Sequence, residues 1–525
     1  MTTIRDIHEV LLNFEKRAEN KPDEIISQTF VDAAPLVEVI CAPLNQIMFG
    51  RRGTGKTHAL RFSLAKARES GETAVYLDLR TIGSNASFYS DEGISLYERG
   101  LSVVTDILAA LHDELLQVAI SKISVALNPE QITIRIDDFS TAISEVRLSG
   151  TPKIEEISRR KSESDAALGL KAAIALTGAD VGLHLNLGAK RSQETETKIS
   201  HDGFVRSIDF GRVQVALSGL LSILGVRRFW LLIDEWSELP REVQPYLADL
   251  IRKTLLPTKG IVVKIAAIEQ RSSFIEPREN GRYIGLELGA DIAADLNLDE
   301  FLVFDYDEDK ALTFFRELIY RNYIALGGDT SEVKNSAALI GLLFTEKRAF
   351  EEFVRAVEGV PRDALNLVSK AVMKSFGQKI GVDVVRRAAL DWYQADKVKV
   401  LSGSSDLQAA LNHIIDEVIG SRKARAFLFP SNVRHRVIER LYDSRVLHLL
   451  KKNISARDEP GKRYDAWKID YGCYVDLIRT QNAPQGLLPT DDGFVDVPED
   501  DYRSIRRAVL LPEDLDGYLN DAGND

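Results

Sequence analysis

The chain has 525 residues, of which 45% are hydrophobic and 28% are charged, and its formal net charge is -12. This length predicts about three or four domains. The composition is typical of a folded globular protein and excludes a disordered chain. The negative net charge excludes a uniformly basic protein coated with nucleic acid, although a local basic face can still bind phosphate within an acidic chain.

The chain carries few signals of secretion, membrane insertion or metal-cluster chemistry. Its two cysteines, Cys41 and Cys473, are far apart and fit neither a disulfide framework nor a zinc cluster. Residues 1–17 mix acidic, basic and apolar side chains, unlike a secretory signal. No segment approaches the roughly 18 consecutive apolar residues of a membrane span. We therefore expect a cytoplasmic protein with no membrane partner.

Residues 41–310 alternate short apolar runs with amphipathic stretches, which predicts an α/β core with a parallel sheet covered by helices. Residues 1–40, which come before this core, form an N-terminal helical segment. The predicted strands of the core are Gln46–Phe49, Thr73–Leu79, Phe229–Ile233, Ile261–Ile268 and Phe301–Phe304. The predicted helices, in which apolar residues are spaced three or four apart, are His58–Ser70, Leu96–Leu127 and Glu242–Leu255.

A polar insertion at residues 126–205 interrupts this alternation. Within it, apolar and polar residues alternate on either side of Thr177 to Asp180, which predicts a β-hairpin. The hairpin could close over an edge of the sheet, or it could be an arm that contacts a partner or another subunit.

Three further regions follow the core. Residues 311–400 have a purely helical pattern and predict a small helical domain. A Ser-Gly stretch then leads into a third domain at residues 403–485. Residues 486–525 contain DDGFVDVPEDD and PEDLDGYLND, which indicates a loosely held acidic tail.

A phosphate-binding loop stands directly after the first predicted strand and before a helix. It is Gly50-Arg51-Arg52-Gly53-Thr54-Gly55-Lys56-Thr57. The glycines let backbone N–H groups converge on phosphates, and the helix N-terminus adds its dipole. We expect Lys56 to reach the β and γ phosphates and Thr57 to offer its hydroxyl to Mg²⁺. The loop and the adjacent His58 are therefore the predicted nucleotide-binding segment.

The strand in FWLLIDEWSELP delivers two acidic residues at its carboxyl end, Asp234 and Glu235. We expect Asp234 to hold the magnesium shell. Glu235 is placed to accept a proton from the attacking water, a role that distinguishes a hydrolase from a kinase or a pure binder. The predicted reaction is hydrolysis of ATP, with Glu235 and Lys56 as catalytic residues.

The segment after Ile261–Ile268 offers candidates for nucleotide sensing. Glu269 or Gln270 could contact the γ-phosphate from the neighbouring strand. The arginines of this segment could each act in the next subunit of an oligomer or simply cover the surface. They are Arg271, Arg278 and Arg282.

These landmarks resemble the AAA+ ATPases, over about residues 40–397. The segment Glu358 to Leu365, EGVPRDAL, looks like the lid motif of the origin-recognition initiator group, and FLVFDYDEDKALTFFREL looks like that group's entry into the lid. The resemblance implies that Arg362 points at the γ-phosphate and acts in catalysis. Two features depart from the family pattern. Lys56 and Asp234 lie 178 positions apart, which is unusually far, and no clear sensor asparagine or threonine follows the fourth strand.

In that group a winged-helix domain follows the lid, and residues 406–480 are compatible with one. The expected helices are Leu407–Val418 and Val433–Leu441, and the expected wing strands are Val446–Lys451 and Tyr464–Ile469. Between Ser421 and Lys468, 13 lysines and arginines stand against 5 aspartates and glutamates, which favours phosphate contacts. The predicted DNA-binding residues are Arg434, Arg436, Arg440, Lys451, Lys452, Lys462 and Arg463. The alternative is a protein-binding module whose positive charge docks the acidic tail.

Two functions follow from these patterns. The first is an ATP-driven AAA+ protein that binds double-stranded DNA as a clamp or an initiator-like factor. The second is a nucleotide-gated switch or sensor, of the kind used in bacterial anti-phage defence, which binds protein partners through the hairpin insertion and the C-terminal domain. The expected partners also include a further protein or, in a homo-oligomer, further copies of the chain. A metabolic enzyme is disfavoured because no second catalytic constellation is visible. Both functions require ATP and Mg²⁺.

Overall fold

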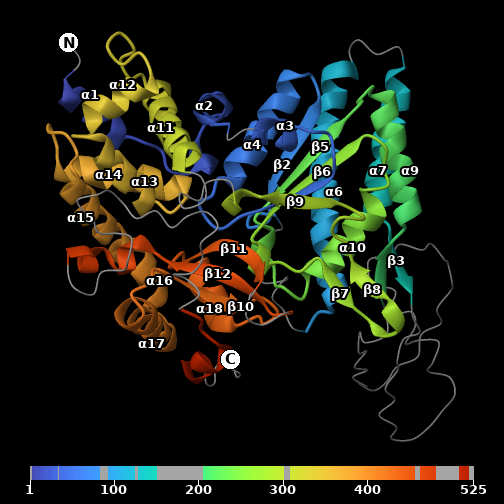
Figure 1. Cartoon of the computed structure of the whole chain (residues 1–525). Coiled ribbons are helices and arrows are strands. Elements are labelled where there is room, and N and C mark those ends of the chain that lie inside the picture. The colour runs from blue at the N-terminus through green and yellow to red at the C-terminus, as the bar shows by residue number, and fades with distance from the viewer. Residues whose placement is uncertain are drawn as a thin grey trace, which may run out of the picture.

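The structure of the chain is a computed structural model. It describes residues 3–32, 35–82, 93–123, 128–149, 205–300, 308–455, 461–479 and 508–518. Figure 1 shows three bodies, which are the sheet with its helices, the helical lid beside it, and a smaller α/β domain below both.

The core is built on a five-stranded parallel sheet with the strand order β2-β5-β6-β1-β9. The strands are β1 (Gln46–Phe49), β2 (Thr73–Asp78), β5 (Phe229–Asp234), β6 (Ile261–Ala267) and β9 (Ala293–Asn297). Every residue of β5 and β6 is buried, which explains why these strands are continuous apolar runs. Four strands confirm the prediction. The fifth is β9, which sequence analysis missed, and residues 301–304 lie outside the described part of the chain.

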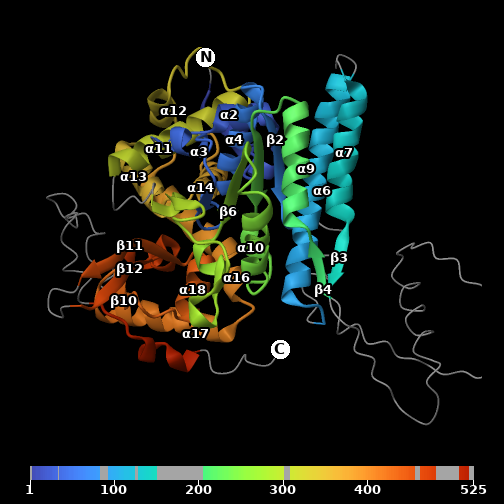
Figure 2. The same ribbon diagram turned by 90° about the vertical axis from the view of Figure 1, so that its right-hand side faces the viewer.

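Helices cover both faces of the sheet. The helix that follows the phosphate-binding loop, α4 (Lys56–Glu69), lies on one face together with α2 (Asp23–Thr29) and α3 (Leu36–Ile40). The other face carries α6 (Leu96–Ile123), α9 (Phe210–Ile223) and α10 (Gln244–Thr254). Figure 2 shows α6 and α9 as an outer layer beside the sheet.

The insertion begins as a helix. Residues of α7 (Pro129–Ser144) share the core that α6 and α9 form on their face of the sheet. The chain then enters β3 (Val146–Ser149), which pairs antiparallel with β4 (Val205–Ile208). The hairpin predicted around Thr177 to Asp180 lies outside the described residues.

The lid is a cluster of helices that also takes in the start of the chain. Its helices are α11 (Glu308–Ala325), α12 (Ser336–Leu343), α13 (Lys347–Ala356), α14 (Pro361–Lys374), α15 (Val382–Trp392) and α16 (Val398–Leu401). Ile7 and Leu11 of α1 (Ile4–Leu12) belong to the same buried core, and Ser369 Oγ donates a hydrogen bond to Leu11 O at 3.2 Å. The predicted N-terminal segment is therefore divided, with α1 on the lid and α2 and α3 on the sheet.

The C-terminal domain has the winged-helix arrangement. Its elements are α17 (Ser405–Ile414) with a π-helical extension (Ile415–Ser421), β10 (Ala426–Pro430), α18 (Arg436–Asp443), β11 (Leu447–Ser455) and β12 (Arg463–Ile469). The strands form an antiparallel sheet with the order β10-β12-β11, so the β11–β12 hairpin is the wing.

Part of the predicted acidic tail is packed against this domain. Leu428 on β10 donates its N–H to Ala508 O at 2.8 Å and accepts from Leu510 N at 3.0 Å. Ala508, Leu510 and Leu515 are buried. Residues 508–518 thus cover the free edge of β10, contrary to the expectation of a loose tail. Among the described helices, none is long and apolar enough to cross a bilayer.

Candidate nucleotide-binding site

The phosphate-binding loop connects β1 to α4 at the carboxyl edge of the sheet. Gly53 (φ 91°) and Gly55 (φ 100°) adopt the left-handed backbone region that favours glycine, and Gly55 caps α4. A Cβ on Gly53 would lie 3.0 Å from Val360 Cγ1 and 3.1 Å from Arg362 Cβ. The glycine therefore lets the lid helix α14 pack directly on the loop.

Lys56 is buried at the centre of this loop. Its Nζ donates to Gly50 O at 2.7 Å and to Arg51 O at 2.9 Å. Burial lowers the pKa of Lys56, while the nearby carboxylates of Asp234 and Glu235 act in the opposite direction. The ammonium is thus held beside the two acidic residues that sequence analysis assigned to magnesium and to water.

The two acidic residues stand at the end of β5, as predicted. Asp234 is fully buried, and its carboxylate accepts from Tyr76 Oη and from Glu235 N, both at 2.8 Å. Glu235 has φ 56°, an uncommon conformation for a non-glycine residue, and such strain is often found at functional sites. Burial, and then the charge of Asp234, raises the pKa of Glu235, which moves the carboxyl toward the range of a general base.

The residues present fit Mg²⁺. No group of three or more His, Cys, Asp or Glu side chains within the described ranges could hold a metal alone. Mg²⁺ needs no such group, because it takes one or two protein oxygens and completes its shell with substrate phosphates and water. The carboxylate of Asp234 retains acceptor capacity beyond its two hydrogen bonds, and Thr57 contributes to the cavity wall.

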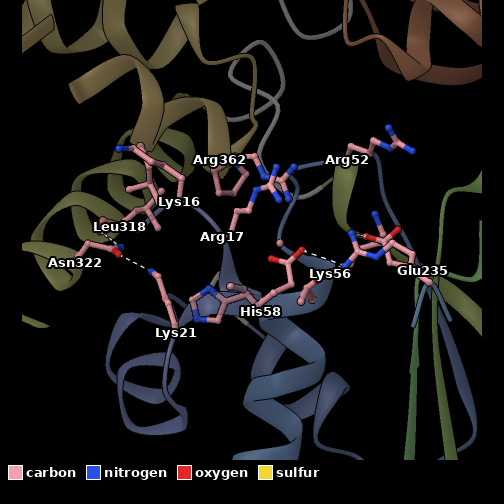
Figure 3. A pocket seen from close by; sticks show the side chains of 18 of the residues that line it. Lys16, Arg17, Lys21, Arg52, Lys56, His58, Glu235, Leu318, Asn322 and Arg362 are labelled. Carbon is pink, nitrogen blue, oxygen red and sulfur yellow. Dashed lines mark hydrogen bonds and ion pairs between the residues drawn. The ribbon is translucent and has the colours of Figure 1, made fainter. Parts of the chain in front are cut away.

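A cavity of about 250 Å³ lies between the loop, the lid and the N-terminal segment (Figure 3). Seven cationic and three anionic side chains line it. The cations are Lys16, Arg17, Lys21, Arg52, Lys56, Arg80 and Arg362, and the anions are Glu19, Glu235 and Glu238. An excess of positive charge around a cavity favours a polyanionic ligand such as a nucleoside triphosphate.

The lid contributes Arg362 to this cavity, as the family resemblance implied. The residue stands at the start of α14, where its N–H donates to Gly53 O at 3.2 Å. In Figure 3 the side chains of Arg362 and Arg17 extend into the same space above Lys56. The lid arginine and the loop therefore face one ligand site.

A second, more apolar space of about 50 Å³ adjoins the first and shares His58 with it. Phe30, Phe314 and Leu318 are among its lining residues. His58 Nε2 lies 3.0 Å from Ile26 O, and burial lowers the pKa of the imidazole to about 4, so the ring is neutral near pH 7. The neighbourhood suits a flat, uncharged group better than a phosphate.

Sequence analysis missed four of the lining cations, Lys16, Arg17, Lys21 and Arg80. Arg80 follows β2, and its Nη1 lies 3.6 Å from Glu235 Oε1 while Asp78 anchors the guanidinium. A charged residue at the carboxyl end of the strand next to β5 was a usable signal. Lys16, Arg17 and Lys21 had no such signal, because only tertiary folding brings the N-terminal segment to the loop.

Several predicted nucleotide, metal or sensor residues do not line the cavity. Gly50 and Thr54 of the loop and Asp234 at the end of β5 are not among its lining residues. The side chain of Arg51 is directed away from the cavity, toward Asp299. Gln270 does not line the cavity, and its Oε1 has no hydrogen-bond partner among the described residues. Glu269 pairs with Lys452 at 2.6 Å. Arg271, an arginine that could have acted in a neighbouring subunit, instead lies 3.9 Å from Glu238 of its own chain.

The remaining arginine candidates also contact their own chain. Arg278 Nη2 donates to Tyr246 Oη at 2.5 Å and pairs with Glu276 at 3.2 Å. Arg282 lies on an exposed turn before β8 (Tyr283–Gly285). Neither residue lines the cavity, and both roles remain predictions.

The predicted DNA-binding residues divide into two groups. The exposed residues are Arg434, just before α18, Arg436 at its start, and Lys451, Lys462 and Arg463 on the wing. Arg440 is half-buried, and Lys452 is directed at Glu269 on the core. The outward group is the candidate DNA surface, and Lys452 must be removed from it.

Comparisons with known proteins bear on this fold. Residues 14–273 match the model of a family described as ORC-CDC6-like. No curated protein sequence matches the chain. Among solved structures, the Orc1 protein of Aeropyrum pernix in complex with DNA is 12% identical, with 90% of this chain and 95% of that chain covered at a TM-score of 0.31. Two RuvB variants of Thermotoga maritima are 16% identical, with 50% of this chain and 83% of theirs covered, at TM-scores of 0.24 and 0.23. The phosphate-binding loop, the acidic pair at the end of β5 and the family match thus agree: residues 14–273 of this chain belong to the ORC-CDC6-like family.

Proposed function

We propose that the chain binds ATP with Mg²⁺ between its core and its lid, hydrolyses it, and uses this cycle to control its contact with duplex DNA. The observation that carries the proposal is the single cavity on which the loop lysine, the acidic Glu235 and the lid Arg362 converge. The first and the last of these three groups are more than 300 positions apart in the sequence. One ligand that contacts all three accounts for their convergence.

In the proposed reaction each residue has a separate task. The loop amides and Lys56 neutralise charge on the phosphates, and Arg362 adds positive charge from the lid. Glu235 orients the attacking water and accepts its proton, for which its raised pKa is suited. Bound Mg²⁺ would supply further charge neutralisation at the phosphates and would be held through Thr57 and Asp234.

The adjoining apolar space at His58 is proposed to take the base of the nucleotide. A neutral imidazole and the rings of Phe30 and Phe314 offer a surface on which a purine can pack. For Gln270 to act as a sensor, nucleotide binding has to move the end of β6 toward the cavity.

DNA contact is proposed for the outward basic group on α18 and the wing. Arg434, just before α18, and Arg436 at its start can neutralise phosphates, and a helix N-terminus is itself favourable to phosphate. The match to the ORC-CDC6-like family covers residues 14–273, so it supports this proposal through the core and not through the C-terminal domain itself.

The rival function is a nucleotide-gated switch whose partners are proteins. The observation that favours it is the edge of β10, which already accepts a peptide segment, residues 508–510, through backbone hydrogen bonds. A sheet edge of this kind can equally receive a strand from another protein.

One set of measurements separates the two functions. The purified full chain is tested for ATP binding by calorimetry, for phosphate release, and for duplex binding over a salt series, each with and without Mg²⁺. We expect ATP turnover, and we expect log affinity for DNA to fall with log salt at a slope of about -4 to -5, if four to six phosphates are neutralised. Turnover without duplex affinity at low salt would leave the switch as the function.

A further inference from the structure

Arg51 is part of the phosphate-binding loop, but its side chain points away from the nucleotide cavity. It is only 3% exposed. Its backbone N–H donates to Asp299 Oδ2 at 2.9 Å, and its Nε donates to Asp299 Oδ1 at 2.7 Å. The next residue, Arg52, is exposed and pairs with Glu238 at 2.6 Å. The loop thus directs one arginine toward the cavity and buries the other behind it.

The C-terminal domain encloses the guanidinium of Arg51. The arginine lies 5.2 Å from the centre of the Tyr442 ring, and its Nη1 contacts His448 Nδ1. Tyr442 Oη donates to the same Asp299 carboxylate at 2.8 Å. Two residues of the winged helix, one on α18 and one on β11, therefore hold a residue of the nucleotide loop from behind.

A chain of buried charges continues from this point to the lid. His448 Nε2 lies 2.8 Å from Asp470 Oδ2, and Asp470 pairs with Lys397. Lys397 also pairs with Asp363 at 3.4 Å. Asp363 is the residue after Arg362 and is 1% exposed. The same buried network thus reaches the residue next to the arginine that faces the cavity.

Arg445 provides a second connection to the lid helix. This residue has a left-handed backbone (φ 60°) just before β11, and its guanidinium pairs with both Asp363 and Asp396. Lys468 on β12 pairs with Glu358, just before α14, at 2.8 Å. The carboxylates of Asp363 and Glu358 are buried, so water cannot replace their partners without a conformational change.

Two further contacts of this domain fall on elements near the nucleotide cavity. Lys452 pairs with Glu269 at the end of β6. Asp443 lies 3.5 Å from Arg271, which shares Glu238 with the cavity residue Arg52. An interface that served only to hold two domains together would not need to meet the loop, the end of β6 and the lid helix at once.

We propose that the C-terminal domain is a structural part of the nucleotide site: its Tyr442 and His448 position the loop through Arg51, and its Arg445 and Asp470 position the lid helix through Asp363, Asp470 by way of the lid residue Lys397. This inference rests on the proposed nucleotide binding. The four residues of the domain are positioning residues, since none of them lines the cavity. Nucleotide binding and docking of the winged helix are then linked, and each must favour the other by the same factor.

The test uses the full chain and two readouts, ATP affinity with Mg²⁺ by calorimetry and hydrogen exchange of β11 with and without ATP. In the unaltered chain ATP should slow exchange at residues 447–455. Arg51→Lys keeps the charge and loses the planar fork that meets Asp299 and His448 together. We expect it to weaken ATP binding by about tenfold, to speed exchange of β11 without nucleotide, and to remove the effect of ATP on that exchange.

Tyr442→Phe is the milder second variant, in case Arg51→Lys does not fold. It removes only the hydrogen bond to Asp299, and we expect ATP affinity to fall by about two- to tenfold. The matched control is Lys399→Ala, an exposed lysine two positions from Lys397, which should change neither readout.

The outcomes are separable. If both variants bind ATP like the unaltered chain and ATP still slows exchange of β11 in them, the linkage is overturned. If the unaltered chain binds no ATP, the proposed function fails instead. In that case, hydrogen exchange measured without nucleotide still tests how the loop is positioned. Faster exchange of β11 in Arg51→Lys, but not in Lys399→Ala, supports the positioning. Equal exchange in the two variants refutes it.

Discussion

The nucleotide cavity and the winged helix carry their positive charge in opposite ways. In the cavity, seven cationic side chains from four parts of the chain face one enclosed space. In the winged helix, positive charge is partly turned inward, where Arg445 and Lys468 are buried against carboxylates of the lid. A local excess of basic residues is therefore not by itself a measure of a DNA-binding surface. Which side chains face outward must be known first.

The difference also separates two kinds of salt sensitivity. Cations in the cavity act on a ligand within a few ångströms, a distance at which screening by salt is weak. Cations on the exposed helix and wing act on a DNA backbone through released counterions, so their contribution falls steeply with salt. The predictions below use this contrast.

The largest effect is expected for Lys56→Ala. The loop loses the buried ammonium that lies beside Asp234 and Glu235, so ATP binding should fall by more than about 100-fold. Calorimetry at fixed Mg²⁺ measures this loss. Duplex affinity measured without nucleotide should stay within about twofold, because the basic residues of α18 and the wing are untouched. ATP affinity equal to that of the unaltered chain would contradict the loop assignment.

Glu235→Gln should separate binding from chemistry. The amide keeps the shape of the side chain but cannot accept a proton from water, so phosphate release should slow by about 10²- to 10⁴-fold while ATP still binds. Single-turnover phosphate release gives the rate. The control is Glu238→Gln, because Glu238 lines the cavity but pairs with Arg52; a smaller loss of rate is expected there. Unchanged turnover in Glu235→Gln would assign the water to another residue.

Reversal of Arg434 and Arg436 to Glu should act on DNA alone. Both are exposed, Arg434 just before α18 and Arg436 at its start, so duplex affinity at low salt should fall by about 10- to 100-fold. The salt slope should become shallower by about two, since each lost phosphate contact removes about 0.9. Fluorescence anisotropy over a salt series measures both, and ATP hydrolysis without DNA is the control readout. Unaltered duplex retention would favour the protein-binding switch.

Each of the two regions holds a buried histidine whose pKa is lowered, which predicts how stability depends on pH. Burial lowers the pKa of His58 in the core to about 4 and the pKa of His448 in the winged helix to about 3. Both values lie below the unfolded value of about 6.5, so the unfolded chain binds more protons as the pH falls, and stability is lost below pH 6.5. At pH 5 each histidine should lower the free energy of unfolding by about 2 kcal/mol.

Urea unfolding at pH 8 and pH 5 checks this expectation. His58→Gln and His448→Gln should each reduce the difference between the two pH values, one for each region. Asp470 acts in the same direction at lower pH, because Lys397 and His448 hold its pKa below the usual range. A pH dependence that neither substitution changes would mean that other groups control acid stability.

Local motifs explain why the core site could be predicted from sequence. The loop at Gly50 to Thr57 and the acidic pair after β5 each lie within a few residues of a buried strand, so the strand fixes their position. The same reasoning failed for β9, which contains Asp295 and Asn297 and lacks the apolar run of a central strand. It lies at the edge of the sheet, where one row of hydrogen bonds suffices to define it.

Contacts between distant segments could not be predicted. Arg51 is 248 positions from Asp299 and 397 from His448, and nothing in the local sequence distinguishes it from the exposed Arg52. The N-terminal cations Lys16 and Arg17 were missed for the same reason. Positions that are set by tertiary packing override local propensity, and a single sequence contains no direct record of them.

The smallest expected effect separates two adjacent lysines of β11. One of them is exposed to solvent, and the other is paired with the core. The pairing of β11 is irregular on both sides of Lys451, and the two lysines differ in their surroundings. Lys451 is exposed on the wing, whereas Lys452 is 32% exposed in its side chain and pairs with Glu269 on the core. Lys451→Ala should therefore reduce the magnitude of the DNA salt slope by about 0.9. Lys452→Ala should leave the slope unchanged and cost at most about 1 kcal/mol of stability, as partly exposed ion pairs do.

Equal slopes in the two variants would mean either that the wing does not touch DNA or that the winged helix leaves the core when it binds. The second case is recognised by faster hydrogen exchange of β11 in the DNA complex.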